Sequence, residues 1–204
     1  MLGMNKWLKN QLAKNFGKFF LMLLMLMSMS SISYAQRVAV KNNLLYDATL
    51  TPNLGFDFRL SNRWTAGISA GYNPFTFSDN KKWKHLLISP EARYWFCDVF
   101  AGHFVGFNAI YSHFNVGNTG NPIGLLYPDV KKERRQGDMG AIGASYGYAW
   151  LLSPHWNFEF EVGADVGYTW FDRYECAKCG AKLGTDKKAF VMPRLSVNFV
   201  YVIK

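Results

Sequence analysis

The stretch Trp156–Trp170, WNFEFEVGADVGYTW, alternates apolar and polar residues with a period of two. Such alternation places successive side chains on opposite faces of a β-strand. One face carries the apolar residues Phe158, Phe160, Val162, Ala164, Val166 and Tyr168. The other carries Asn157, Glu159, Glu161, Gly163, Asp165 and Gly167. The stretch therefore predicts one long strand whose two faces differ in chemistry.

The same alternation recurs along the chain and predicts eight strands. Their approximate ranges are 37–48, 54–60, 64–73, 86–96, 103–113, 139–151, 156–169 and 190–203. Short connections (61–63, 97–102 and 152–155) alternate with long ones (73–85, 114–138 and 170–189). All short turns then lie at one end of the sheet and all long loops at the other. An even strand number with this loop pattern is typical of an antiparallel up-and-down transmembrane β-barrel.

The composition of the polar face favours a membrane barrel over a soluble lipocalin-like barrel. Much of that face is small: Gly67, Ser69, Gly71, Gly143, Ser145, Gly147, Gly163 and Gly167. An eight-stranded barrel leaves only enough interior for side chains, so small residues are expected there. Aromatic residues lie toward the ends of the apolar face, as membrane-interface girdles require: Trp64, Tyr72, Tyr94, Trp150 and Tyr168. The sequence thus predicts an all-β, OmpA-type barrel with its polar face inside.

The charged residues of the polar face are expected to point into the lumen. They are Lys41, Asp47, Asp57, Arg59, Glu91, Arg93, Glu159, Glu161, Asp165 and Arg194. Unpaired buried charge is costly, so these groups should form a network that fills the barrel. A gated ion path, or a catalytic carboxylate pair at Glu159 and Glu161, is the functional alternative.

The N-terminal segment resembles a cleaved signal peptide. Four lysines precede the apolar run Phe19–Ile32, and Ser33 and Ala35 stand at the small-residue positions of a cleavage site. We expect a signal peptide at 1–35, cleavage after Ala35, and one barrel domain at 36–204. Removing the four lysines lowers the formal net charge from +9 to +5. That charge is too small to argue for nucleic acid.

Two cysteines, Cys176 and Cys179, lie in the last long loop, whereas Cys97 lies near a short turn at the other end. In an exported protein the pair is expected to form a local disulfide. A zinc clip with His85 and His113, which would complete four ligands, is the alternative. We expect no cofactor and no metal.

The long loops carry basic residues that could meet anions at the cell surface. They are Lys81, Lys82, Lys84, Lys131, Lys132, Arg134 and Arg135. Lipopolysaccharide phosphates or an acidic surface polysaccharide would suit them, whereas solvated loop tips are the plain alternative. Ser112–His113 and Ser153–His155 are candidates for a lipid-modifying enzyme, but neither forms a catalytic motif. We therefore expect a non-enzymatic protein.

Four segments together resemble a known family: KNNLLYDATLTPNLGFDFRL (Lys41–Leu60), GYNPFTFSDNKKWKH (Gly71–His85), PEARYWFC (Pro90–Cys97) and YECAKCG (Tyr174–Gly180). They are similar to an uncharacterised domain-of-unknown-function family of small exported proteins from anaerobic Gram-negative gut and oral bacteria. The resemblance implies a barrel in the outer membrane, sometimes encoded near fimbria assembly genes, and no known activity. Ala177 departs from the family pattern, in which Pro is common.

The resulting hypothesis is a monomeric outer-membrane barrel with its long loops facing the cell exterior. Its role would be structural or a surface interaction, associated with fimbriae or the envelope. A lipid-modifying enzyme and a soluble periplasmic lipocalin-like binding barrel are the alternatives.

Overall fold

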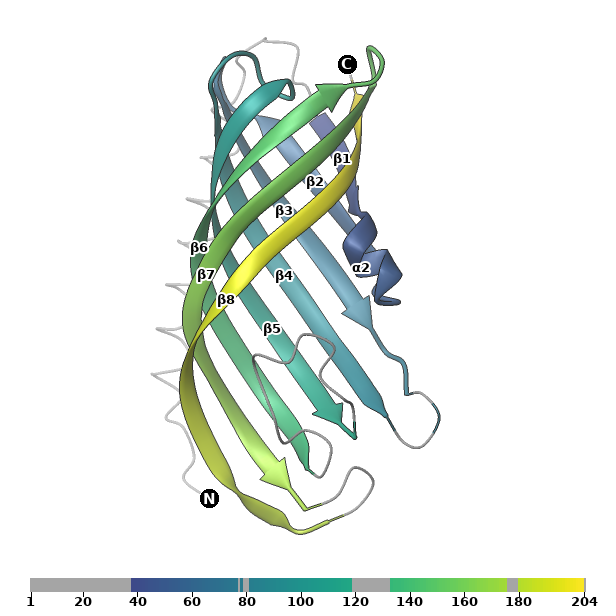
Figure 1. Cartoon of the computed structure of the whole chain (residues 1–204), viewed down its shortest axis with the longest axis vertical. Helices are drawn as coiled ribbons and strands as arrows, with labels where there is room; N and C mark the ends of the chain where they lie inside the picture. Colours follow the sequence, from purple (N-terminus) through teal and green to yellow (C-terminus); the bar gives the residue numbers. More distant parts are fainter. Residues whose placement is uncertain (1–37, 77, 79–80, 119–132, 176–179, 204) are drawn as a thin grey trace, which may run out of the picture. The chain divides into compact units, whose positions relative to one another are not determined.

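A computed structural model of the chain describes residues 38–76, 78, 81–118, 133–175 and 180–203. In them eight antiparallel strands form a closed barrel in chain order, with the last strand paired to the first (Figure 1). The strands are β1 (Val38–Asn43), β2 (Asn53–Arg59), β3 (Trp64–Asn73), β4 (Lys82–Trp95), β5 (Gly102–Gly117), β6 (Arg134–Leu151), β7 (Trp156–Tyr174) and β8 (Lys182–Ile203). The predicted eight-stranded up-and-down topology is confirmed.

The first predicted strand is wrong in its second half. Residues 44–48 form a short helix, α2 (Leu44–Ala48), instead of continuing β1. The side chain of Asn43 accepts a hydrogen bond from the Leu45 amide at 3.0 Å and caps this helix. Leu50 then adopts a positive φ of 56°, and the chain turns back into β2. Two consecutive asparagines, Asn42 and Asn43, mark the point where the alternation stops.

The strands on the β5–β8 side extend farther toward the long loops than predicted. β7 runs to Tyr174 and β8 begins at Lys182, so both continue beyond the apolar stretch. Figure 1 shows β6, β7 and β8 reaching past the end of β3. These ends carry polar residues on both faces, so they show no hydrophobic alternation and could not be predicted from it. Backbone pairing nevertheless continues the strands there.

The two faces of the barrel wall are inverted relative to a water-soluble protein. In β7, Glu159, Glu161 and Asp165 are fully buried, whereas the outward Val162 and Val166 are 49% and 50% exposed. The outer surface is a belt of large exposed apolar residues contributed by strands β2 to β8. Polar groups thus occupy the interior and apolar groups the exterior.

Two apolar clusters lie inside the barrel. Trp95, Phe100 and Phe104 pack together at the short-turn end, with ring centroids of Trp95 and Phe104 4.7 Å apart. The Trp95 indole donates a hydrogen bond to Thr65 at 3.1 Å, which satisfies its buried N–H. Toward the long loops, Leu87, Ile110 and Ala141 form a second cluster against which Tyr46 of α2 packs. The lumen is therefore filled with side chains near both ends.

One edge of the wall is not closed by strand pairing along its full length. β1 pairs only with Asn198–Ile203 of β8, because it ends where α2 begins. α2 lies beside β8, where a longer β1 would run (Figure 1). In the described part of the chain, no helix is long and apolar enough to span a membrane.

Candidate functional site

The centre of the lumen is a network of ion pairs built around Arg93. From β4 its guanidinium reaches Glu159 and Glu161 of β7, each at 2.9 Å, although β4 and β7 are not neighbours in the sheet. Its Nε also lies 2.8 Å from Glu91, and the group sits 4.6 Å from the centroid of the Phe104 ring. Arg93 thereby connects two strands that are not neighbours. Its contact with Phe104 links the ion pairs to the apolar cluster of Trp95, Phe100 and Phe104.

Lys41 and Arg194 complete this lumen network. The Lys41 ammonium lies 3.0 Å from both Asp57 and Glu91. Arg194 lies 2.7 Å from Glu161 and 3.4 Å from Glu91. Its seven members are Lys41, Asp57, Glu91, Arg93, Glu159, Glu161 and Arg194, all with side chains at most 15% exposed.

Glycines beside the network leave room for its carboxylates. A Cβ atom at Gly67 would collide with the Asp57 carboxylate, and one at Gly143 would collide with the Asp165 carboxylate. The Asp165 carboxylate in turn accepts a hydrogen bond of 2.7 Å from Asn108. The small residues of the polar face are therefore required by lumen crowding.

One of the ten residues expected in the lumen, Asp47, lies elsewhere, and Arg59 lies half-buried at the short-turn end of β2. Asp47 is exposed on α2, where its carboxylate accepts a 2.9 Å hydrogen bond from Asn53. Asp47 lies outside the lumen because α2 stands where the sequence predicted a continuation of the first strand. Arg59 donates to the Ser61 carbonyl at 3.1 Å and to the Asn62 side chain at 2.7 Å, so it braces the β2–β3 turn.

The carboxylates of the lumen network are paired with cations, and little free volume lies beside them. Glu159 and Glu161 both bind Arg93, so neither is placed as a free acid or base. The cavity beside Lys41, Tyr46 and Arg194 has a volume of about 40 Å³. That volume holds a few water molecules at most, too little for a substrate.

The basic residues predicted at the rim that fall in the described part of the chain lie in different surroundings. Lys81 is exposed in the β3–β4 loop, while Lys82 and Lys84 are half-buried on β4. Arg134 lies 4.2 Å from the centroid of the Tyr174 ring. Arg135 is only 7% exposed, with its guanidinium 5.3 Å from the Phe171 centroid, so it is not an exposed contact. Lys131 and Lys132 lie outside the described residues.

The ends of β6–β8 that extend beyond the apolar belt are held together by ion pairs whose side chains are mostly half-buried. Arg173 lies 2.9 Å from Asp186 and 3.6 Å from Glu133. Lys182 lies 2.8 Å from Asp172, which also accepts a hydrogen bond of 2.6 Å from Thr185. The Lys182 ammonium, and after it the Thr185 hydroxyl, hold the pKa of Asp172 below its ordinary value.

A polar cluster that sequence reasoning missed lies on the outer face near the long loops. Nδ1 of His113 is 2.9 Å from the Asp138 carboxylate, which also accepts a 2.7 Å hydrogen bond from the Tyr111 hydroxyl. Asp138 lies directly opposite His113 across β5 and β6. The cluster depends on this register, which spacing along one strand does not reveal.

The other candidate histidines lack such a partner or face elsewhere. His85 contacts Thr51, a buried residue of the interior, at 3.4 Å, so it does not share a face with the outward His113. This separation argues against a zinc clip that uses both. His155 bonds the Val202 carbonyl at 3.0 Å, and His103 contacts the Tyr146 hydroxyl.

The cysteine pair at Cys176 and Cys179 lies outside the described residues, so its predicted disulfide stays a prediction. Cys97 is a free, exposed thiol near a short turn. Among the described residues, no group of three or more His, Cys, Asp or Glu side chains could hold a metal ion.

Comparison with known proteins identifies a family but no activity. A family model described as a protein of unknown function (DUF3575) matches residues 19–203, nearly the whole chain. No curated protein matches the chain. The match agrees with the resemblance of the four segments noted from the sequence. The chain is a member of the DUF3575 family.

Proposed function

We propose that this protein is an outer-membrane β-barrel with a structural or surface-interaction role and no catalytic activity. The observation that carries the proposal is the inverted wall: buried ion pairs inside, centred on Arg93, and a belt of exposed apolar side chains outside. In water such a belt would be far larger than the apolar patches of soluble proteins. In a bilayer it is the required surface.

The height of the belt fits a bilayer. Along β7 it extends from Phe158 to Tyr168, which at about 3.3 Å per residue and a tilt of about 40° gives about 25 Å. Aromatic residues border it at both ends. Trp156 stacks on Phe199 at 4.7 Å near the short turns, and Tyr168 and Trp170 lie near the long loops. These borders match the interfacial girdles of membrane barrels.

The packing of the lumen supports an anchoring role over a pore or a lipocalin-like carrier. A carrier needs an apolar cavity in its interior, and a porin needs a water-filled one. Here the lumen network fills the middle and the two apolar clusters lie near its ends. A rigid barrel of this kind would present the long loops and the extended ends of β6–β8 at the surface.

The basic residues near the long loops favour an anionic surface partner. Exposed Lys81 and the lysines of β8 would favour anionic groups, such as lipopolysaccharide phosphates, acidic polysaccharide or an acidic fimbrial segment. The expected signal peptide supports export, and long loops facing the exterior follow if the short turns remain periplasmic.

Refolding into lipid vesicles tests the proposal. We expect the chain without residues 1–35 to float with the vesicles and to migrate differently on gels before and after boiling. Planar bilayers containing it should show no steady conductance. A protein that stays soluble and monomeric without lipid or detergent would overturn the membrane proposal. Steady channels would overturn the anchoring role alone.

A lipid-modifying enzyme is the second candidate because of the His113–Asp138 pair. A histidine oriented by a carboxylate at the membrane edge can act as a general base. In the described part of the chain, no serine hydroxyl is hydrogen-bonded to His113. Lipid extracts of cells carrying His113→Ala, compared with His155→Ala, discriminate the two functions. A lipid species that changes only with His113→Ala would favour the enzyme.

A further inference from the structure

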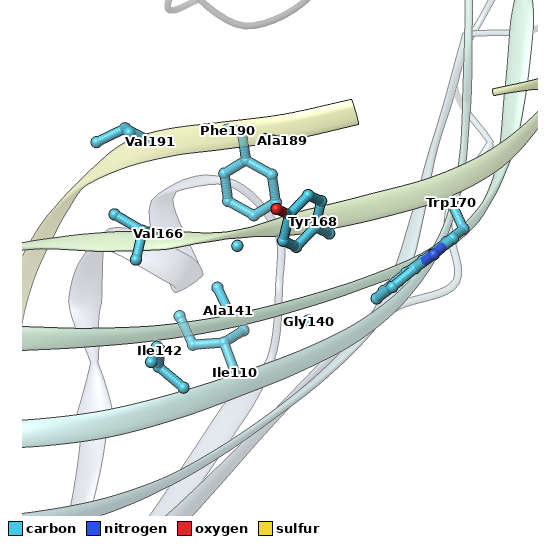
Figure 2. A pocket seen from close by; sticks show the side chains of 11 residues that line it. Ile110, Gly140, Ala141, Ile142, Val166, Tyr168, Trp170, Ala189, Phe190 and Val191 are labelled. Atoms are coloured by element: carbon cyan, nitrogen blue, oxygen red, sulfur yellow. The ribbon is translucent and has the colours of Figure 1, made fainter. Parts of the chain in front are cut away.

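The outer wall formed by β6, β7 and β8 contains a groove of about 800 Å³ toward the long-loop end (Figure 2). The strand register explains it. Gly140, Tyr168 and Ala189 form one row across the three strands, and Ile142, Val166 and Val191 form the next. Gly140 and Ala189, the small residues on either side of Tyr168, leave a hollow beside the larger side chains of Ile142, Val166 and Val191. Figure 2 shows these side chains along the three strands.

The groove opens to the outside of the barrel. Tyr168 is 51% exposed, Val191 is 67% exposed and Ile142 is 66% exposed. It is lined by outward residues of β6–β8 and, at its floor, by the inward residues Ile110, Ala141, Gly167 and Phe190. The lining is apolar except for the Tyr168 hydroxyl and the Trp170 indole. The volume lies within the range of about 300–1,000 Å³ that is usual for small-molecule sites. An elongated apolar group would therefore fit it.

A cation stands at the long-loop end of the groove. The Lys187 ammonium lies 4.9 Å from the Tyr168 ring centroid and 5.4 Å from that of Trp170. No carboxylate of the described residues lies within 4 Å of it. Asp138, in the same row as Trp170 and Lys187, is bound instead by Tyr111 and His113. The ammonium thus remains available to an anion.

We propose that the groove binds one anionic lipid, with an acyl chain over Gly140 and Ala189 and a headgroup phosphate on Lys187. The inference rests on the proposed membrane location and adds a specific lipid site to it. The cation lies at one end of the apolar hollow, just as the charged headgroup lies at one end of the acyl tail in a lipid molecule. Free phosphate would leave the hollow unused. A cation at the membrane surface contributes about 1 kcal/mol of attraction to anionic lipid, or roughly a five-fold preference.

Two substitutions test the acyl-chain contact and the headgroup contact separately. A Cβ atom at Gly140 would lie 3.9 Å from Cζ3 of Trp170, its nearest neighbour apart from the adjacent residues, so Gly140→Leu fills the groove with little strain at the Cβ. Lys187→Gln removes the charge and keeps most of the side-chain length. Ala70→Leu, on the exposed outer face of β3, and Lys84→Gln, on β4, are matched controls away from the groove.

Native mass spectrometry of the detergent-solubilised barrel, with phosphatidylglycerol or phosphatidylcholine of identical chains, measures the retained lipid. We expect one retained phosphatidylglycerol, favoured about five-fold over phosphatidylcholine. Lys187→Gln should abolish the preference and Gly140→Leu the retention, whereas both controls behave as the wild type.

Equal retention of the two lipids by the wild type would overturn the proposal. So would identical behaviour of Gly140→Leu and Ala70→Leu, or a dimer that Gly140→Leu dissociates, since a second copy would then occupy the groove. Vesicle flotation separates this failure from that of the membrane proposal. A barrel that floats but retains no lipid refutes the site alone, whereas a protein that does not float refutes the membrane location as well.

Discussion

At the scale of single residues, Arg93 is the group on which the lumen depends most. Three carboxylates, Glu91, Glu159 and Glu161, approach its guanidinium within 2.9 Å. Removing one partner of a buried ion pair is far more costly than replacing the whole pair, because the remaining charge stays buried without compensation. The network therefore behaves as a unit.

Arg93→Met should lower the free energy of unfolding by about 3–5 kcal/mol, because it leaves these carboxylates without their main partner. Urea titration of the vesicle-inserted barrel measures the loss. Arg59→Met, at the exposed turn, should cost below about 1 kcal/mol. The triple variant Arg93→Met, Glu159→Gln, Glu161→Gln should recover part of the loss. Equal losses for the Arg93 and Arg59 variants would contradict the account.

Asp172 supplies a pH-dependent contact beyond the apolar belt. Its depressed pKa means that its pairing with Lys182 stabilises the β7–β8 tip above the ordinary carboxyl pKa of about 3.9. The contribution is lost as pH falls through the lower folded-state pKa. Carboxyl-detected NMR titration should show the pKa of Asp172 rising toward its ordinary value in Lys182→Ala. An unchanged titration would exclude Lys182 as the main cause.

At the scale of elements, α2 closes the side of the barrel that β1 leaves open. Tyr46 packs from this helix against the cluster of Leu87, Ile110 and Ala141. The long edge of β8 beside it carries Lys187, Lys188 and Pro193, residue types that discourage pairing with foreign strands. A helix plug and a protected edge together substitute for the missing part of β1.

Tyr46→Ala should destabilise the barrel by roughly 2–4 kcal/mol, because it leaves a cavity beside the cluster of Leu87, Ile110 and Ala141. Leu44→Ala, at an exposed position of the same helix, is the control and should cost well under half as much. Denaturant unfolding by intrinsic fluorescence compares the two. Indistinguishable midpoints would mean that α2 does not seal the lumen.

The sequence predicted some strands more accurately than others. Strict alternation placed β7 and the end of β8 correctly, because one face is apolar throughout. It failed at α2, since the helix is fixed by the Asn43 cap rather than by hydrophobic pattern. It also stopped short of Tyr174 and Lys182, where strand pairing continues between polar side chains such as Asp172 and Thr185.

At the scale of the whole molecule, the topology followed from strand number and loop lengths, whereas the sites did not. Alternation placed Arg93 and Glu161 on the inner face, but their meeting across the lumen depends on barrel closure. The His113–Asp138 pair and the groove between Gly140 and Ala189 depend on register between strands. Register is a property of the assembled sheet and is not visible in any one segment.

The central claim is that the apolar face contacts lipid and the polar face does not. Quenching of single tryptophans by brominated acyl chains tests it most directly, with the other tryptophans replaced by Phe. Phe160→Trp reports the outer face within the belt, and Trp95 reports the buried interior. We predict strong quenching at position 160 and little at Trp95. Weak quenching at position 160 in vesicle-bound protein would contradict the account.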